Sequence, residues 1–439
     1  MKISYLILFG GFFVGISSIS AQEKTNMKLE EAIQLAWTKS NEVSLANTKV
    51  ETKKQELQSV KNTQYPDLKI TGQYLRLTKA TVDLEIDAGS AVLPVPDQLL
   101  VGQASLKVPI YAGMKVQNGI KLQNNLFEAE NAMASQTKED VAMRVINYYA
   151  DLYKAQRTVE LLKENQKSAQ QRVTDFTALE KNGIIPRNDL LKSQLQVSRL
   201  QLSLDEALNN ETIINYYLVT LLKLPTETKL VVNESDLIGF PKDEVPTDEK
   251  PAFENRKDLA ALQFKEKATQ NNVNMAKSDY YPSIALVGGY AALNLNNIIT
   301  LQNAMFLGVG VSYDISGILK NGTQVKIAES KALEVKNSEE LLKDNIRIQV
   351  QQAINNYDLA IKQNIVYNQA VEQATENYRI VKDKYDNGLS DTNDLLEADV
   401  DQLKSKISET IAKVDVIQKY YELLSTTGQL SQTFNLSKI

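Results

Sequence analysis

Carboxylate pairs are the first candidates for chemistry in this sequence. Asp394 and Glu397 are three residues apart, so they would share one face of a helix. Two such groups can act as acid and base in hydrolysis. Nothing in the sequence around them supplies a substrate cleft, however, and we do not expect this pair to catalyse a reaction.

A structural role is the alternative for these residues and their neighbours. Short polar side chains favour the N-cap of a helix. Four residues stand where helices should begin: Asn188, Asp189, Asn393 and Asp394. Glu397, one turn further on, suits the positive end of the same helix. We expect capping to be the main role of Asn188 and Asn393, whereas Asp394 and Glu397 fit a lining role on one shared face.

Composition excludes most other chemistries. The 439 residues include no cysteine and no histidine, which removes thiolate nucleophiles, disulfides, the commonest general base and the usual zinc ligands. The net charge of −5 argues against a large nucleic-acid footprint, because such a surface needs clustered Lys and Arg. We therefore predict a protein that is not an enzyme and that binds neither a cofactor nor a metal ion.

The N-terminus has the pattern of a secretory signal peptide, predicted at residues 1–21. Lys2 precedes an apolar run from Tyr5 to Ile16, and small residues lead to Ala21, where we expect cleavage. The run is too short to span a membrane comfortably, and no later stretch approaches the length of about 18 apolar residues that a membrane helix needs. The sequence thus predicts an exported protein without a helical anchor.

Glycine and proline positions expose an internal duplication. In each half, an Asn-Gly pair begins a long stretch without Gly or Pro that ends at a second Asn-Gly pair, and a Tyr-Pro step lies upstream. The matched pairs are Asn118-Gly119 with Asn321-Gly322, Asn182-Gly183 with Asn387-Gly388, and Tyr65-Pro66 with Tyr281-Pro282. These ordered matches predict two structural repeats, 22–225 and 253–439, joined by an inter-repeat linker at 226–252.

Each repeat is predicted to contain a helix, a strand, a loop, a strand, a very long helix, a turn and a helix. The first helix is expected over Leu29–Gln64 in copy one and over Arg256–Tyr280 in copy two, each stopped before a proline. The long helices carry a 4-3 apolar repeat, which indicates left-handed supercoiling against neighbouring helices. In copy one the repeat consists of Val141, Val145, Tyr148, Leu152, Ala155, Val159 and Leu162.

Four segments between the helices alternate like strands. They are Leu68–Tyr74, Ala104–Ile110, Met305–Ile315 and the more weakly patterned Ser283–Leu293. Their lengths are close to the roughly 9–11 residues of a tilted strand that crosses a bilayer. A soluble antiparallel sheet shows the same alternation, but the export signal and the tyrosines near the strand ends favour a membrane. The connecting loops, Lys79–Leu100 and Asn294–Gln302, would then face the cell exterior.

A membrane sheet of four strands cannot stand alone, because its edge backbone groups would be unsatisfied in lipid. Several protomers must therefore contribute strands to one barrel. Their long helices, projecting from the same side, would continue the barrel as a helical tube. The predicted fold class is mainly α, with duplicated long coiled-coil helices and a small membrane β part of four strands per protomer.

With these features the sequence resembles the TolC-type outer-membrane efflux protein family over roughly Met27 to Gly428. The resemblance rests on the duplicated layout, the Tyr-Pro strand starts and the paired Asn-Gly-x-x-x-x-Asn-Asp-Leu-Leu turns. It implies a homotrimer with a twelve-stranded barrel in the outer membrane and a helical tunnel in the periplasm. Such passive ducts serve tripartite pumps or type I secretion, and they dock a periplasmic adaptor (membrane fusion) protein and, through it, an inner-membrane transporter of the RND or ABC type.

The resemblance also implies roles for residues near the two turns, at the periplasmic entrance of such a tunnel. Asp394 and Glu397 match two inward carboxylates of a cation-favouring constriction, although the family has aspartate at the second position. Tyr385 matches a tyrosine of the closing network and Asp189 its acidic partner, whereas Ser390 replaces a basic residue of that network. Four turn residues fall where adaptor tips are expected to contact the duct: Asn182, Gly183, Asn387 and Gly388.

One rival hypothesis keeps the coiled coils and omits the barrel. The protein would then be an exported periplasmic structural or adaptor-like protein, recovered in the soluble periplasm rather than in membranes. Under both hypotheses the acidic segment Pro225–Pro251, which contains four prolines, is predicted to be the inter-repeat linker. In the family the corresponding region wraps the middle of the tunnel.

Overall fold

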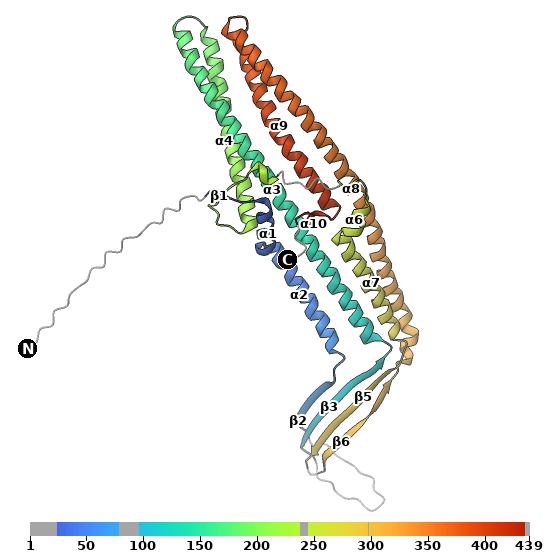
Figure 1. Cartoon of the computed structure of the whole chain (residues 1–439). Coiled ribbons are helices and arrows are strands. Elements are labelled where there is room, and N and C mark those ends of the chain that lie inside the picture. Colours follow the sequence, from blue (N-terminus) through green and yellow to red (C-terminus); the bar gives the residue numbers. More distant parts are fainter. Residues whose placement is uncertain (1–23, 79–95, 238–244, 297, 435–439) are drawn as a thin grey trace, which may run out of the picture. The chain divides into compact units, whose positions relative to one another are not determined.

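The structure, a computed structural model, describes residues 24–78, 96–237, 245–296 and 298–434 (Figure 1). The chain divides into two compact units. Unit 1 comprises Met1–Ser40, Arg144–Pro241 and Ala360–Gln418, and unit 2 comprises Asn41–Met143, Lys242–Leu359 and Lys419–Ile439. The predicted signal peptide, 1–21, and most of the predicted loop Lys79–Leu100 lie outside the described residues.

Helices dominate the described residues, as predicted, and two of them are very long. α3 spans Lys115–Lys181 with 67 residues, and α8 spans Ile315–Asp386 with 72 residues. A tight turn and a return helix follow each of them: α4 (Arg187–Leu222) and α9 (Thr392–Thr426). The other described helices are α1 (Leu29–Lys39), α2 (Asn41–Asn62), α5 (Glu234–Leu237), α6 (Lys250–Asn255), α7 (Lys257–Ser278) and α10 (Leu430–Thr433).

The element order occurs twice along the chain. α2, β2, β3, α3 and α4 are followed later by α7, β5, β6, α8 and α9 in the same order. The division into repeats at 22–225 and 253–439 stays a prediction. The intervening segment 226–252 is more than a connector, because it contributes the short strand β4 (Lys229–Val231) and α5 to unit 1.

The predicted first helix of copy one, Leu29–Gln64, is wrong as a single element. α1 ends at Lys39 and α2 begins at Asn41, because Ser40 has extended backbone angles, φ −66° and ψ 142°. Serine is a favoured residue at the start of a helix, which explains why the break falls there. In copy two, α7 lies within the predicted range Arg256–Tyr280.

Unit 2 contains a four-stranded antiparallel sheet in the order β2-β3-β5-β6. The strands are β2 (Asp67–Arg76), β3 (Gln98–Ala112), β5 (Ser283–Leu295) and β6 (Ile299–Ser312). β5 is the strand with the weakest sequence pattern. Two glycines interrupt its alternation, and at Gly289 the ring of Phe306 lies so close that an added Cβ would approach it to 2.7 Å.

Several of the predicted boundaries in this sheet are wrong. The strand predicted from Ala104 begins at Gln98, so the predicted loop Lys79–Leu100 ends too late. The strand predicted at Met305–Ile315 ends at Ser312, and Ile315 is the first residue of α8. Asp314 explains the change, because it accepts a hydrogen bond from the Ser316 hydroxyl (2.7 Å) and one at its carbonyl from the Gly317 amide (3.2 Å), as a helix start requires. The predicted loop Asn294–Gln302 is also too long, since both of its ends belong to strands.

The helices of unit 1 pack through the predicted apolar repeat. Val159, Leu162 and Ala169 of α3 form a buried cluster with Leu200 and Leu204 of α4 and with Leu403 of α9. A second cluster joins Phe176 of α3, Leu190 of α4 and Leu395 of α9, with Tyr378, Val381 and Tyr385 of α8 packed against it. Residues from both halves of the sequence therefore share one core in unit 1.

The described N-terminal segment is held in unit 1 by strand pairing and by tyrosine hydroxyls. β1 (Lys24–Asn26) pairs in parallel with β4. The buried Tyr149 of α3 donates to the Met27 carbonyl at 2.8 Å, and Tyr153 donates to Glu234 at 2.9 Å. Lys413 of α9 also contacts Glu234, and its hydrogen bond holds the pKa of this carboxyl below the usual value. Burial raises the pKa of Tyr153 to about 12, so this tyrosine stays a hydrogen-bond donor.

Unit 2 has its own helical core and holds the last described helix. Ala252 and Leu259 pack against Ile346 and Val350 of α8. The amide of Ser431 in α10 donates to the carboxylate of Glu139 in α3 at 3.3 Å. Burial raises the pKa of Glu139, whose side chain is largely shielded from water.

Candidate functional site

The sheet of unit 2 has one face that is apolar along nearly its whole length. Directly paired residues share a face, so the register assigns every side chain to one side. On β6, Met305, Leu307, Val309 and Val311 are all more than 60% exposed. Their cross-strand neighbours on the same face are Leu68, Ile70, Tyr74, Leu100, Ala104, Leu106, Val108, Tyr111, Ile284, Leu286 and Tyr290. We call this surface the apolar face.

The opposite face is polar or small over most of the sheet. On β2 and β3 it carries Asp67, Lys69, Thr71 and Gln73, paired with Lys107, Ser105, Gln103 and Val101. On β5 and β6 the same face has mostly small residues, among them Ala285, Gly289, Ala291, Gly308 and Gly310. We call this surface the polar face. The contrast means that the two sides of the sheet are suited to different surroundings, one apolar and one aqueous.

The two outer strands leave the sheet open at its edges. In the order β2-β3-β5-β6, β2 and β6 each have one neighbour among the described strands. An exposed apolar face next to free strand edges is an aggregation risk in water, and natural proteins pair or cover such edges. The sheet is therefore incomplete as a single chain.

No described helix is both long and apolar enough to cross a membrane. In the same part of the chain, no three acidic side chains come together as ligands for a metal ion.

The two turns at the predicted entrance have nearly the same backbone. Gly183 and Gly388 adopt left-handed angles, φ +71° and +74°, as glycine after a helix commonly does. In both turns the residue after the glycine donates its amide back to the last helical turn: Ile184 to the Leu179 carbonyl at 2.9 Å, and Leu389 to the Lys384 carbonyl at 2.8 Å. This is the pattern of a Schellman motif.

The side chains of the turns are also alike. Asn182 donates through its side-chain amide to the Ala178 carbonyl, and Asn387 does the same to the Asp383 carbonyl, both at 2.8 Å. Ile184 and Leu389 are 67% and 77% exposed, although the residue at this position of a Schellman motif usually packs against its helix. Both turns therefore present an apolar side chain to solvent.

Two of the predicted constriction residues, Asp189 and Tyr385, meet one neighbour that was not predicted, Thr392. The Thr392 hydroxyl donates to Asp189 at 2.9 Å and lies 3.5 Å from the Tyr385 hydroxyl. Asp189 is half-buried and also lies 3.6 Å from the Lys192 ammonium. The Tyr385 ring stacks on Phe176 with 5.8 Å between ring centroids. Thr392 thus connects the acidic residue of the first turn region with the tyrosine of the second.

The other two predicted constriction residues lie apart from this cluster. Asp394 and Glu397 are both exposed on α9. Asp394 accepts a hydrogen bond from the Ser390 hydroxyl at 2.8 Å, so Ser390, which stands in place of a basic residue, orients the carboxylate without neutralising its charge. The two carboxylates therefore remain available to solvent or to another chain.

The predicted capping roles of Asn188 and Asn393 are wrong. α4 begins at Arg187 after Pro186, which caps no amide with its side chain. α9 is capped by Asp391, whose carboxylate accepts the amides of Asn393 (2.8 Å) and Asp394 (3.0 Å). The helices start earlier than expected, because proline preorganises one start and aspartate satisfies the free amides of the other.

A buried polar cluster near the turns was missed by the sequence analysis. Arg172 of α3 and Asp399 of α9 lie 3.1 Å apart, with side chains only 10% and 3% exposed. The amides of Gln196 and Asn165 also donate to the Asp399 carboxylate, at 3.0 and 3.1 Å. Asp399 is seven residues after Thr392, so the same heptad face of α9 makes both contacts. That spacing was the only signal in the sequence.

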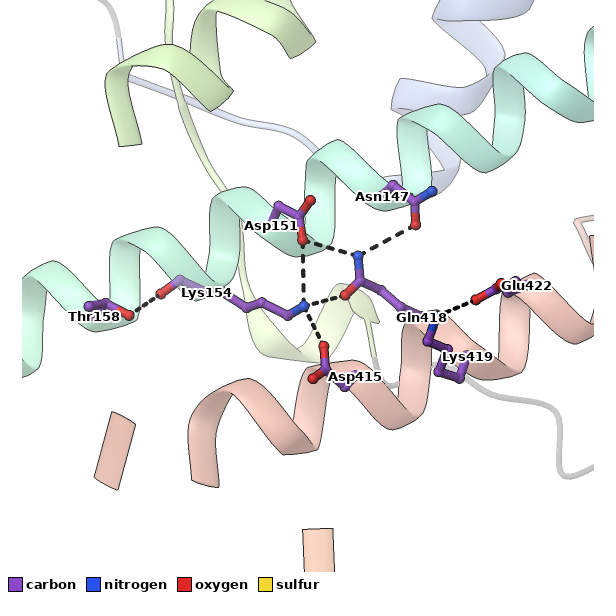
Figure 2. A network of polar contacts seen from close by, with 8 residues as sticks. All are labelled: Asn147, Asp151, Lys154, Thr158, Asp415, Gln418, Lys419 and Glu422. Atoms are coloured by element: carbon purple, nitrogen blue, oxygen red, sulfur yellow. Dashed lines mark hydrogen bonds and ion pairs between the residues drawn. The ribbon is translucent and has the colours of Figure 1, made fainter. Parts of the chain in front are cut away.

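Figure 2 shows a second polar network between α3 and α9 in unit 1. The Lys154 ammonium donates to Asp415 at 2.5 Å and also contacts Gln418. The Gln418 amide donates to Asp151 at 3.1 Å and to Asn147 at 3.4 Å. Lys154 is 17% exposed, so its charge is largely desolvated and depends on these partners. The contacts tie the return helix of the second half to the long helix of the first.

A groove of about 690 Å³ lies between α3 and α8 near the turns. Phe176, Tyr378 and Tyr385 contribute aromatic side chains to its wall. Charged residues of both signs also line it: Glu164, Lys167, Arg172, Asp175, Lys382 and Asp386. Such a surface combines apolar contact area with charges that could orient a partner.

Comparisons with known proteins agree with this architecture. Residues 250–429 match the family model described as outer membrane efflux protein. Among proteins with curated descriptions, none matches the chain in sequence.

Solved structures share the fold over nearly the whole chain at low sequence identity. The CmeC outer membrane channel of Campylobacter jejuni is 16% identical, with a TM-score of 0.79, over 98% of this chain and 94% of that one. The outer membrane protein VceC of Vibrio cholerae is 14% identical, with a TM-score of 0.75, over 91% and 96%. The MtrE outer membrane channel of Neisseria gonorrhoeae, solved in an open state, is 15% identical, with a TM-score of 0.75, over 92% and 89%.

Proposed function

We propose that this chain is an outer membrane efflux protein, as the match of residues 250–429 and the shared fold suggest, and that it works as a non-enzymatic, homotrimeric exit duct of the outer membrane. The duct would receive its cargo from a periplasmic adaptor protein and an inner-membrane transporter. It would itself be passive, with the energy supplied by the transporter.

The observation that carries this proposal is the open sheet of unit 2. Its apolar face is largely exposed, and its outer strands β2 and β6 each have a free edge. Lipid can cover the apolar face, but it cannot satisfy free backbone groups. Pairing β6 of one copy with β2 of the next removes both edges. With three copies, as the family resemblance implies, twelve strands would close around the polar face.

The two turns that follow the long helices support the proposed contact with an adaptor. Both turns expose an apolar residue beside a rigid Schellman backbone, and the aromatic groove between α3 and α8 lies next to them. We propose that Asn182, Gly183, Asn387 and Gly388 contact the adaptor. Tyr385 and Asp189, joined through Thr392, would close the entrance, and the exposed carboxylates of Asp394 and Glu397 would line its narrowest part.

Fractionation and mass measurement test the duct itself. The protein should be recovered with outer membranes and, in a mild detergent, have the mass of three chains. Recovery as a monomer in the soluble periplasm would reject the duct in favour of a periplasmic coiled-coil protein.

The adaptor contact can be tested by crosslinking, because the sequence contains no cysteine. Asn182→Cys and Asn387→Cys each introduce a single reactive thiol at an exposed turn. Either variant, labelled with a photoactivatable maleimide in cells, should give a product with the adaptor. Lys54→Cys, at an exposed position on α2, serves as the matched control and should give none. Equal crosslinking from all three positions would argue against docking at the turns.

A further inference from the structure

The polar face of the sheet is not polar throughout. Toward the hairpin ends of the strands, two consecutive cross-strand rows on this face become apolar. The first row is Leu75, Leu99, Leu295 and Ile299, and the second contains Val101, Leu293 and Leu301, together with Gln73. We call the seven apolar residues of these rows the exit collar. Leu75, Ile299 and Leu301 are 46–53% exposed, so the collar is open to solvent in the single chain.

The place of the collar follows from the chain path. β2 leaves α2 at Asp67 and β3 leads into α3, so the helices adjoin one end of the sheet. Leu75 and Leu99 lie at the other end, next to the connection between β2 and β3, and Leu295 and Ile299 flank the connection between β5 and β6. In a duct whose helices lie in the periplasm, this end opens to the cell exterior. The collar would therefore surround the exit.

Lipid contact does not explain the exit collar. At the same level of the sheet, the opposite side has Tyr74, Leu100, Asn294 and Thr300, so the side toward lipid is becoming more polar where the collar begins. Apolar residues on the water-filled side of a sheet expose apolar surface to water, which favours contact with an apolar group. Passing cargo with an apolar part would cover this surface.

A lysine lies within reach of the collar on the same face. Asp67 is paired with Lys107, so these opposite charges face each other, whereas Lys69 is paired with the uncharged Ser105. Lys69 is exposed and four residues from Gln73, which corresponds to about 13 Å along a strand. An alkyl chain of about ten carbons covers a similar length. The face thus offers an apolar region and a positive charge at matching separation.

We propose that the exit collar is a binding site for amphiphilic anions. Their apolar part would contact Val101, Leu293 and Leu301 of the collar, in the row of Gln73, and their negative group would lie near Lys69. This inference rests on the proposed duct and adds to it a class of cargo. It also assigns a selectivity role to residues other than those of the proposed entrance.

Single-channel currents in planar bilayers test the site, with decyl sulfate below its micellar concentration as the probe. Decyl sulfate added from the exit side should interrupt the current of the wild-type channel. Hexyl sulfate, four methylenes shorter, should need at least about a tenfold higher concentration, because each methylene adds apolar contact. The collar variant Val101→Thr, Leu293→Thr, Leu301→Thr should raise the blocking concentration of decyl sulfate at least about tenfold.

A matched pair of substitutions controls for general effects on the sheet. Val101→Thr lies in the collar, and Val287→Thr lies on the same face beside Lys107. Only Val101→Thr should weaken the block. Lys69→Gln should weaken the block by decyl sulfate and strengthen that by decyltrimethylammonium, whose positive group Lys69 repels. Trimer mass and unblocked conductance should match the wild type in every variant.

The outcomes separate this proposal from the duct. If the wild-type protein forms no channels, the proposed function itself fails. If it conducts and decyl sulfate blocks the collar variant as well as the wild type, the exit collar is not a binding site. Equal block by hexyl and decyl sulfate would also overturn the proposal, since the apolar part would then make no contact.

Discussion

The two turns at the proposed entrance have nearly the same backbone, and each exposes an apolar residue, yet the helices that follow them start differently. After Gly183, α4 begins behind Pro186, with no side chain accepting its first amides. After Gly388, α9 begins behind Asp391, which accepts two of them. The two halves of the chain are thus alike at the end of each long helix and differ at the start of each return helix.

The acidic residues that follow diverge as well. Asp189 is held by the Thr392 hydroxyl of the other hairpin, whereas the Asp394 carboxylate accepts a hydrogen bond from Ser390 of its own turn and is exposed. Equivalent positions in sequence therefore have different partners: one stabilises the contact between hairpins, and the other leaves its charge free. Repeats that form one assembly need not keep equivalent roles, because each copy meets different neighbours.

Disrupting the buried Arg172–Asp399 pair between the hairpins should have the largest effect on stability. Asp399→Leu leaves the Arg172 guanidinium buried without its carboxylate, and removing one partner of such a pair costs about 3–5 kcal/mol. Hydrogen exchange of the α9 amides near Asp399 should accelerate accordingly. The double variant Arg172→Met, Asp399→Leu, which buries no lone charge, should recover most of the protection. Unchanged exchange in Asp399→Leu would mean that the hairpins do not depend on this pair.

The shared backbone of the turns predicts equal sensitivity to a side chain at the glycines. Gly183→Val and Gly388→Val force a branched residue into left-handed angles, at a cost of about 1–2 kcal/mol each. Nothing lies within 4 Å of an added Cβ at either glycine, so backbone strain is the expected source of the cost. Limited proteolysis should show similar acceleration of cleavage at the two turns. A large difference would show that the turns are not equivalent even in backbone.

The helix starts should respond unequally to loss of the residue before them. Asp391→Ala removes an acceptor for two amides and should cost about 1 kcal/mol. Pro186→Ala removes no hydrogen bond and should cost less than about half of that. Hydrogen exchange at residues 393–394, compared with 188–189, measures the difference. Similar losses at both turns would contradict the asymmetry.

The smallest expected effect concerns the charges themselves. Asp394→Asn with Glu397→Gln should lower the cation-to-anion permeability ratio about twofold, equivalent to about 0.4 kcal/mol, because exposed carboxylates raise the local cation concentration. Asp189→Asn, which changes a bonded and half-buried group, should alter the ratio less. Reversal potentials in a salt gradient provide the measurement. If Asp189→Asn changed the permeability ratio more than Asp394→Asn with Glu397→Gln does, Asp189 and not the exposed pair would line the narrowest part.

Much of this architecture could be predicted from local sequence signals. The Asn-Gly pairs specify both turns, since the observed angles need glycine. The apolar repeat through Val145, Leu152 and Val159 marks residues that are buried in the structure. The alternation of β2 and β3 assigned their faces correctly. The break at Ser40 and the early start of α8 were not predicted. In each case a single polar residue, Ser40 or Asp314, ends an element within a pattern that is otherwise helical or strand-like.

The sequence by itself determined the duplicated order of elements, the long helices and the absence of cysteine and histidine chemistry, because periodicity and composition act locally. The tertiary structure decided which charges are paired. Arg172 and Asp399 are 227 residues apart in sequence, and no local pattern indicates that burial brings them together. The tertiary structure also decided that four residues form one row across the sheet: Leu75, Leu99, Leu295 and Ile299. Alternation in the sequence assigns each residue only to a face, whereas strand register determines which residues are neighbours.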